Sequence, residues 1–214
     1  MKRLLSLLFI SASLLSAAKS QPLLREWLTS MPDSVMPLLT HNDRLDFIDF
    51  CDAQMAAVVT NVMDGTSRMD TLTADYVHIS YTPSTDVEMK LLPTSDTTHI
   101  LCMVTTVKAR VSDSRIAFYD AQWQPLDASV LFAEPQMEDF RSATADDTAA
   151  QAWDKLDIYF RTYHLSPDEP SLRCVLTATD FLSEDDRAAL APLVSREPLQ
   201  YRWVDGRFIV HHER

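Results

Sequence analysis

The chain has 214 residues, 46% of them hydrophobic, and its 31 acidic residues outnumber 19 basic ones to give a net charge of −12. A surface with this charge repels phosphate backbones and anionic lipids, so we expect no nucleic-acid partner and no anionic membrane partner. Only two glycines occur, Gly65 and Gly206. Phosphate-binding loops, dinucleotide fingerprints and nucleophile elbows need closely spaced glycines, and the sequence therefore excludes them.

The amino terminus, residues 1–18, has the three-part pattern of a secretory signal peptide. A basic start precedes an apolar run from 4 to 15, and Ser16 and Ala18 suit the −3 and −1 positions of a cleavage site. The run is shorter than the roughly 20 residues needed to span a bilayer. We therefore expect a periplasmic or secreted protein with no membrane insertion after signal cleavage. Loss of the two basic residues would lower the net charge to −14.

The segment after the cleavage site predicts two helices. In the first, Leu24, Trp27, Leu28 and Met31 recur at helical spacing before a proline interrupts the pattern. The second is expected to begin with Asn42 or Asp43 as its cap and to run to about Ala57. A turn at 63–67 follows, where Gly65 is expected to supply a positive φ.

The second predicted helix carries an aspartate at every third position: Asp43, Asp46, Asp49 and Asp52. On a helix this spacing spreads the carboxylates over about half the circumference, whereas metal ligands must converge on one ion. Apolar side chains gather on the other side, at Phe47, Ile48, Cys51, Met55 and Val58. The row of aspartates is therefore best interpreted as the solvated face of a helix, with Arg44 or another segment pairing some of the charges.

The pattern then changes to that of strands, expected at 69–72, 75–82, 87–92, 99–111 and 115–120. The short links between them favour an antiparallel meander. After a polar connector at 133–151, strands return at 156–165 and 172–181. Ser183 then opens a helix over 183–193, with Asp186 at capping-box spacing. The chain ends in a predicted two-residue hairpin around Asp205 and Gly206.

Together these elements predict the α+β class, with N-terminal helices packed on an antiparallel meander sheet. A second strand-rich sub-half, ending in the β-hairpin, completes the chain. The size and hydrophobic content suit a single domain over 19–214, with sub-halves at 19–132 and 133–214.

The hairpin register places three aromatic side chains, Tyr201, Trp203 and Phe208, on one face. Trp203 should stand opposite Phe208, and Tyr201 opposite Val210. This face is either a lid on the core or a platform for a ligand or partner.

No residue pattern points to catalysis, a metal or a cofactor, and we expect none of the three sites. The three cysteines, Cys51, Cys102 and Cys174, are buried thiols, or the last two form a bridge. Six histidines are scattered without metal-ligand spacing: His41, His78, His99, His164, His211 and His212. A site assembled from distant Asp, His and Tyr residues stays open, because such groups meet in space rather than in sequence.

The chain resembles a family of secreted proteins from Bacteroidales that is known only as a domain of unknown function. The resemblance lies in "MPDSVMPLLT", "NDRLDFIDFCDAQM", "VEMKLLP", "FYDAQWQPL", "LTATDFLSEDDRAALAPL" and "YRWVDGRFIV". It implies an exported single unit and carries no activity.

These observations favour an exported binding or accessory protein of the periplasm or cell envelope, without enzymatic activity. Its partner would be an unidentified protein or a small ligand. A small hydrolase-like enzyme is the alternative, and a structural or inhibitory module that presents its sheet to a protein is a third hypothesis.

Overall fold

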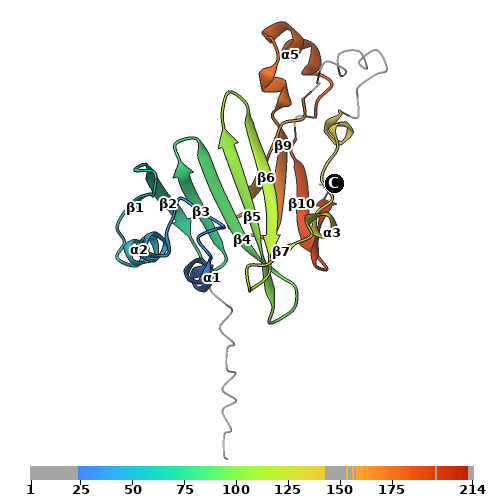
Figure 1. The fold of residues 1–214 in the computed structure, drawn as a ribbon. Coiled ribbons are helices and arrows are strands. Elements are labelled where there is room, and N and C mark those ends of the chain that lie inside the picture. The colour runs from blue at the N-terminus through green and yellow to red at the C-terminus, as the bar shows by residue number, and fades with distance from the viewer. Residues whose placement is uncertain (1–23, 143–152, 154–155, 157, 196, 212–214) are drawn as a thin grey trace, which may run out of the picture.

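The structure, a computed structural model, describes residues 24–142, 153, 156, 158–195 and 197–211. It has the predicted α+β class, with a seven-stranded antiparallel sheet (sheet A), a four-stranded antiparallel sheet (sheet B) and short helices (Figure 1). The expected signal peptide and residues 143–151 of the polar connector lie outside the described residues.

Sheet A is a meander in which each strand pairs with the next along the chain. The five predicted strands correspond to β2 to β6, which the short links hold antiparallel. The two edge strands, β1 and β7, were not predicted. The bounds are β1 Ala57–Thr60, β2 Thr66–Leu72, β3 Tyr76–Thr82, β4 Thr85–Pro93, β5 His99–Lys108, β6 Ser112–Tyr119 and β7 Pro125–Leu126.

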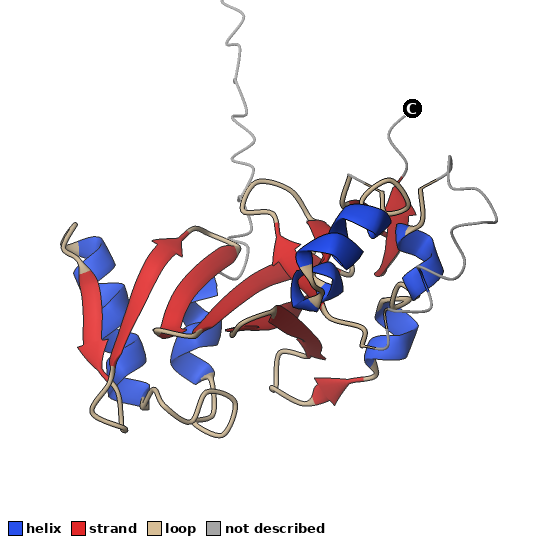
Figure 2. Ribbon diagram, turned by 90° about the horizontal axis from the view of Figure 1, so that it is seen from above, coloured by secondary structure: helices blue, strands red, loops and turns tan. Residues whose placement is uncertain are grey.

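Two helices, α1 (Leu24–Ser30) and α2 (His41–Asp52), cover one face of sheet A (Figure 2). Helix α1 buries Leu24, Trp27 and Leu28, and α2 buries Phe47. They pack on the alternate strand residues that point to this side of the sheet, among them Val77, Ile79, Met89, Leu101 and Met103. This is the first of two cores.

Helix α2 differs from its prediction at both ends. Its N-cap is Thr40, whose hydroxyl oxygen accepts from the backbone N–H of Asp43 at 3.3 Å, while the Asp43 carboxylate accepts from the backbone N–H of Thr40 at 2.7 Å. This reciprocal pair is a capping box. The helix ends at Asp52 rather than near Ala57, because Ala57 starts β1 and pairs with β2. Met55 is consequently exposed instead of joining the apolar face.

The turn between β1 and β2 also corrects a prediction. The positive φ of 56° belongs to Asp64, not to Gly65. A Cβ on Gly65 would instead lie 3.2 Å from the Asn61 side chain. The glycine therefore allows the Asn61 side chain to approach the backbone closely. Asn61 uses that approach to accept from the backbone N–H of Gly65 at 3.1 Å.

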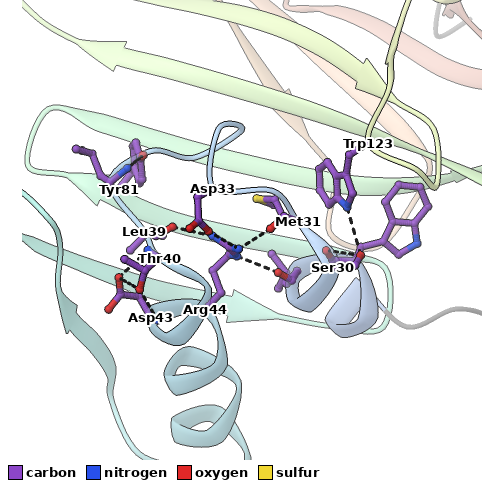
Figure 3. A network of polar contacts seen from close by, with 12 residues as sticks. Ser30, Met31, Asp33, Leu39, Thr40, Asp43, Arg44, Tyr81 and Trp123 are labelled. Atoms are coloured by element: carbon purple, nitrogen blue, oxygen red, sulfur yellow. Dashed lines mark hydrogen bonds and ion pairs between the residues drawn. The ribbon is translucent and has the colours of Figure 1, made fainter.

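Arg44 joins α2 to the end of α1 and to the loop that connects them (Figure 3). Its side chain is 1% exposed, although the sequence placed it among solvated charges. The guanidinium donates to the carbonyl of Leu28 at 3.0 Å, to that of Leu39 at 2.7 Å and to that of Met31, and it pairs with Asp33 at 2.9 Å. A buried cation is thus surrounded by acceptors, as its desolvation requires.

Sheet B has the strand order β11-β10-β9-β8. Its strands are β8 Arg161–Leu165, β9 Ser171–Leu176, β10 Leu199–Val204 and β11 Arg207–His211. The predicted strands at 156–165 and 172–181 were too long, since the second ends where the 3₁₀ helix η3 (Ala178–Phe181) begins.

Helix α5 (Glu184–Leu190) starts at the predicted cap, Ser183, which accepts from the Asp186 N–H. Before sheet B lie α3 (Ala128–Leu131) and the 3₁₀ helix η1 (Met137–Phe140).

The second core lies between sheet B and the face of sheet A that α1 and α2 leave free. Sheet A contributes Tyr76, Leu92, Cys102 and Phe118, and sheet B contributes Tyr163, Leu172, Cys174 and Tyr201. The segment after residue 132 thus packs on sheet A, and the single domain over 19–214 stays a prediction.

Candidate functional site

The aromatic hairpin face belongs to the second core. Tyr201, Trp203 and Phe208 are all buried. The rings of Trp203 and Phe208 lie 5.1 Å apart, and Phe118 of sheet A stacks on Trp203 at 6.5 Å. The indole N–H donates to the carbonyl of Pro93 at 2.7 Å. These contacts favour the core-lid interpretation over a platform exposed to a ligand.

The turn of the hairpin explains how these rings come together. Asp205 and Gly206 have φ angles of 50° and 79°, the two positive values that a type I′ turn requires. This turn fixes the predicted register, with Trp203 opposite Phe208 and Tyr201 opposite Val210.

A pocket of about 290 Å³ lies beside the same hairpin, between α3 and β11. Its walls are formed by residues 129–133, Tyr201 and residues 207–210. Two of the three singled-out aromatics, Tyr201 and Phe208, therefore form part of a pocket wall, while Trp203 does not. Arg207 is the only charged residue among these lining residues.

The pocket sits at the free edge of sheet B, because β11 is the end strand. Phe132 makes a parallel bridge to Phe208 and so closes part of that edge. Two aliphatic side chains border the pocket while exposed to solvent, Val130 at 68% and Val210 at 44%. The sequence offered no motif for this site, since it joins two segments that are distant along the chain.

Burial keeps two groups neutral here, the Tyr201 phenol in the pocket wall and the Cys174 thiol in the second core. Burial raises the pKa of Cys174 to about 12 and raises the pKa of the Tyr201 phenol as well. The pocket thus suits an apolar group, with Arg207 able to meet a polar or anionic neighbour at its border.

A polar cluster on β2 and β3 is relevant to the hydrolase hypothesis. The Ser80 hydroxyl donates to Asp70 Oδ2 at 2.7 Å, and His78 Nδ1 lies 3.3 Å from the same oxygen. Arg68 pairs with the other oxygen of Asp70 at 2.5 Å. In a serine triad the imidazole stands between the hydroxyl and the carboxylate. Here the carboxylate stands between the other two groups, which leaves the hydroxyl without a base.

Other titratable side chains tie the two sheets together. Glu88 of β4 accepts from the Tyr76 hydroxyl at 3.1 Å and from the backbone N–H of Leu165 in β8 at 3.0 Å. The buried Lys90 pairs with Asp75 at 2.9 Å and donates to the carbonyl of Pro167 at 2.9 Å. Each of these polar groups therefore has a partner, as buried polar groups must. The bonds to Leu165 and Pro167 join sheet A to the segment that forms sheet B.

The aspartates of α2 separate as predicted. Asp46 and Asp49 are exposed, Asp43 completes the capping box with the N-cap Thr40, and Asp52 pairs with Arg25 at 2.6 Å. Among the residues that the structure describes, no group of three or more His, Cys, Asp or Glu is placed to hold a metal ion.

The three cysteines are free thiols, so the Cys102–Cys174 bridge is not present. Cys102 and Cys174 are buried in the second core, and Cys51 is half-buried beside Met69. Burial raises the pKa of each thiol.

The fold and these sites define an α+β protein of two packed antiparallel sheets, with a pocket at one sheet edge. Residues 17–208 match the model of a family described as a protein of unknown function (DUF3256), and the chain belongs to that family. A solved structure of a domain of an uncharacterized protein from Porphyromonas gingivalis W83 is similar, with 30% sequence identity and a TM-score of 0.79. The match covers 88% of this chain and 98% of that chain. No curated protein matched.

No helix in the described part of the chain has the length and apolar character needed to cross a membrane.

Proposed function

We propose that the protein is an exported, non-enzymatic binding or accessory protein of the periplasm or cell envelope. The α3–β11 pocket would hold an apolar side chain of a partner protein or the apolar part of a small ligand. One observation carries this proposal: Val130 and Val210 stay exposed around a pocket at a free sheet edge. Single exposed aliphatic residues are ordinary, but those that border a concave site are typical of binding surfaces.

Export is supported by the signal-peptide pattern of residues 1–18. The net charge of −12 disfavours nucleic acid and anionic lipid as partners. A protein or a small apolar molecule is therefore the expected occupant, and no cofactor is needed for it to bind.

The hydrolase-like alternative has less support. Its best candidate constellation is Asp70, His78 and Ser80, in which the serine proton is held by the carboxylate rather than by the imidazole. A nucleophilic serine needs an adjacent base to accept that proton.

The test is affinity capture from a native envelope extract with the tagged mature chain. Val130→Asp places a charge at the pocket border and should abolish recovery of the specific protein or small ligand. Val62→Asp is the matched control, because Val62 is also exposed but lies in the β1–β2 turn of sheet A. Equal recovery by the wild type and Val130→Asp, or specific recovery of nothing, would overturn the proposal.

A further inference from the structure

The outer face of sheet B is basic, although the chain as a whole is acidic. Strand alternation points the core residues inward and leaves every second residue outward. The outward positions carry arginines, histidines, aliphatic and small polar residues: Thr162, His164, Ser171, Arg173, Val175, Gln200, Arg202, Val204, Arg207, Ile209 and His211. This face holds no Asp or Glu among its described strand positions, in a chain with 31 acidic and 19 basic residues.

The register aligns the three arginines in a row. Arg173 of β9 stands opposite Gln200, so Arg202, two residues further along β10, is its diagonal neighbour. Arg202 in turn stands opposite Ile209, which makes Arg207 of β11 the next diagonal neighbour. Diagonal positions lie about 7–8 Å apart. The row, called the arginine row below, therefore crosses three adjacent strands.

No carboxylate forms an ion pair with the arginine row in the described part of the chain. Arg173, Arg202 and Arg207 are exposed, and within the described part of the chain none of their side chains makes an ion pair or a hydrogen bond. By contrast, Arg25 and Arg68 pair with aspartates. Like charges on neighbouring strands repel each other. An anionic partner would relieve this repulsion and form ion pairs at the same time.

We infer that the outer face of sheet B binds an acidic segment of a partner protein. Guanidinium groups form paired hydrogen bonds with carboxylates. Val204 and Ile209 are exposed on the same face and fit aliphatic side chains of that segment. A long polyanion such as nucleic acid would meet repulsion from the acidic remainder of the surface, whereas a short acidic segment would not. Arg207 and Ile209 also line the α3–β11 pocket, whereas Arg173, Arg202 and Val204 do not, so the inference rests on the sheet face as a whole.

Fluorescence anisotropy with the full mature chain tests the inference. The probe is a short fluorescein-labelled peptide of alternating glutamate and leucine. The triple change Arg173→Gln, Arg202→Gln and Arg207→Gln should weaken binding by at least roughly tenfold, since it removes three ion pairs. Higher salt should weaken binding to the wild type more than binding to this variant.

The matched control removes three cations from elsewhere, with Lys108→Gln, Arg110→Gln and Arg115→Gln on the β5–β6 hairpin. This control changes the net charge by the same amount and should retain the wild-type affinity. The inference is overturned if the peptide does not bind, if both triple variants lose affinity equally, or if the row binds heparin oligosaccharide or phosphatidylglycerol vesicles but not the peptide. Circular dichroism of each variant confirms that it is folded.

Discussion

The Ser80 hydroxyl donates its hydrogen bond to Asp70, 2.7 Å away, and not to the imidazole of His78. Asp70 is the extra residue where the β2–β3 register shifts between Met69 and Thr71. Its carboxylate also accepts from the Ser80 backbone N–H at 3.2 Å. Asp70 is thus the extra residue of a β-bulge, and its own carboxylate bonds across the bulge to Ser80 of β3. This role is structural.

Replacement of Asp70 by alanine should destabilise the fold. The change removes two hydrogen bonds to a charged acceptor and the pairing with Arg68, so we expect a loss of about 1–3 kcal/mol in the free energy of unfolding. Urea denaturation measures this loss. Asp49→Ala, on the exposed face of α2, is the control and should stay within about 0.5 kcal/mol of the wild type. A similarly small effect at Asp70 would contradict the structural role.

Arg44→Met should be among the most damaging substitutions in the N-terminal half. Methionine keeps the apolar stem but leaves the carbonyls of Leu28, Met31 and Leu39 without their donor. We expect a loss of about 3–5 kcal/mol, as when one partner of a buried charged network is removed. Arg115→Met on the exposed surface is the control. If the two variants unfold at the same urea concentration, Arg44 does not hold α1 and α2 together.

The stability of the fold should fall as the pH falls through about 6.5. Burial lowers the pKa of His164 below its ordinary value of 6.5, with Arg173 and His78 acting in the same direction and the carboxylates of Glu88 and Asp86 opposing it. The unfolded chain therefore binds more protons at this ring than the folded chain does, so protonation favours unfolding.

His164→Gln removes this group and should flatten the pH dependence of the free energy of unfolding between about pH 7.5 and about pH 5.5. His41→Gln, at an exposed site, should leave the wild-type dependence unchanged. An unaltered slope for His164→Gln would show that another group governs the acid response.

Gly206→Ala tests the hairpin turn without disturbing any contact. A Cβ on Gly206 would meet nothing within 4 Å, but its φ of 79° strains any L-amino acid with a side chain. The expected cost is about 1 kcal/mol from the backbone alone. Asp205→Asn keeps a residue suited to the turn and should be neutral. Thermal unfolding compares the two, and equal melting temperatures would be inconsistent with the type I′ turn.

The thiols should differ in reactivity. Cys51 is half-buried and should be alkylated by iodoacetamide in the native protein, whereas Cys102 and Cys174 should react only after unfolding. Mass spectrometry of the intact, non-reduced protein should show three thiols. A mass lower by two hydrogens would indicate a disulfide.

The sequence predicted elements that local chemistry determines. The hairpin followed from Asp205 and Gly206, because two consecutive positive φ angles need such residues. Helix α5 followed from the Ser183 cap, and the central strands followed from the apolar runs of sheet A.

Features that depend on distant partners were missed or placed wrongly. Ala57 and Val59 point to the same side of β1, but their sequence also fits the end of a helix. Pairing with β2 is what makes this segment a strand. Arg44 is buried because carbonyls of other segments surround it. The pocket depends on α3 meeting β11, which no local pattern encodes.

Photo-crosslinking at the pocket border tests the binding role most directly. The mature chain would carry p-benzoylphenylalanine at position 130, and a control would carry it at the exposed Met63 in the β1–β2 turn. Irradiation in the native envelope extract should give a discrete adduct from position 130 and none of that mass from position 63. If position 130 gives no adduct, or if both positions give the same one, the α3–β11 pocket is not the binding site.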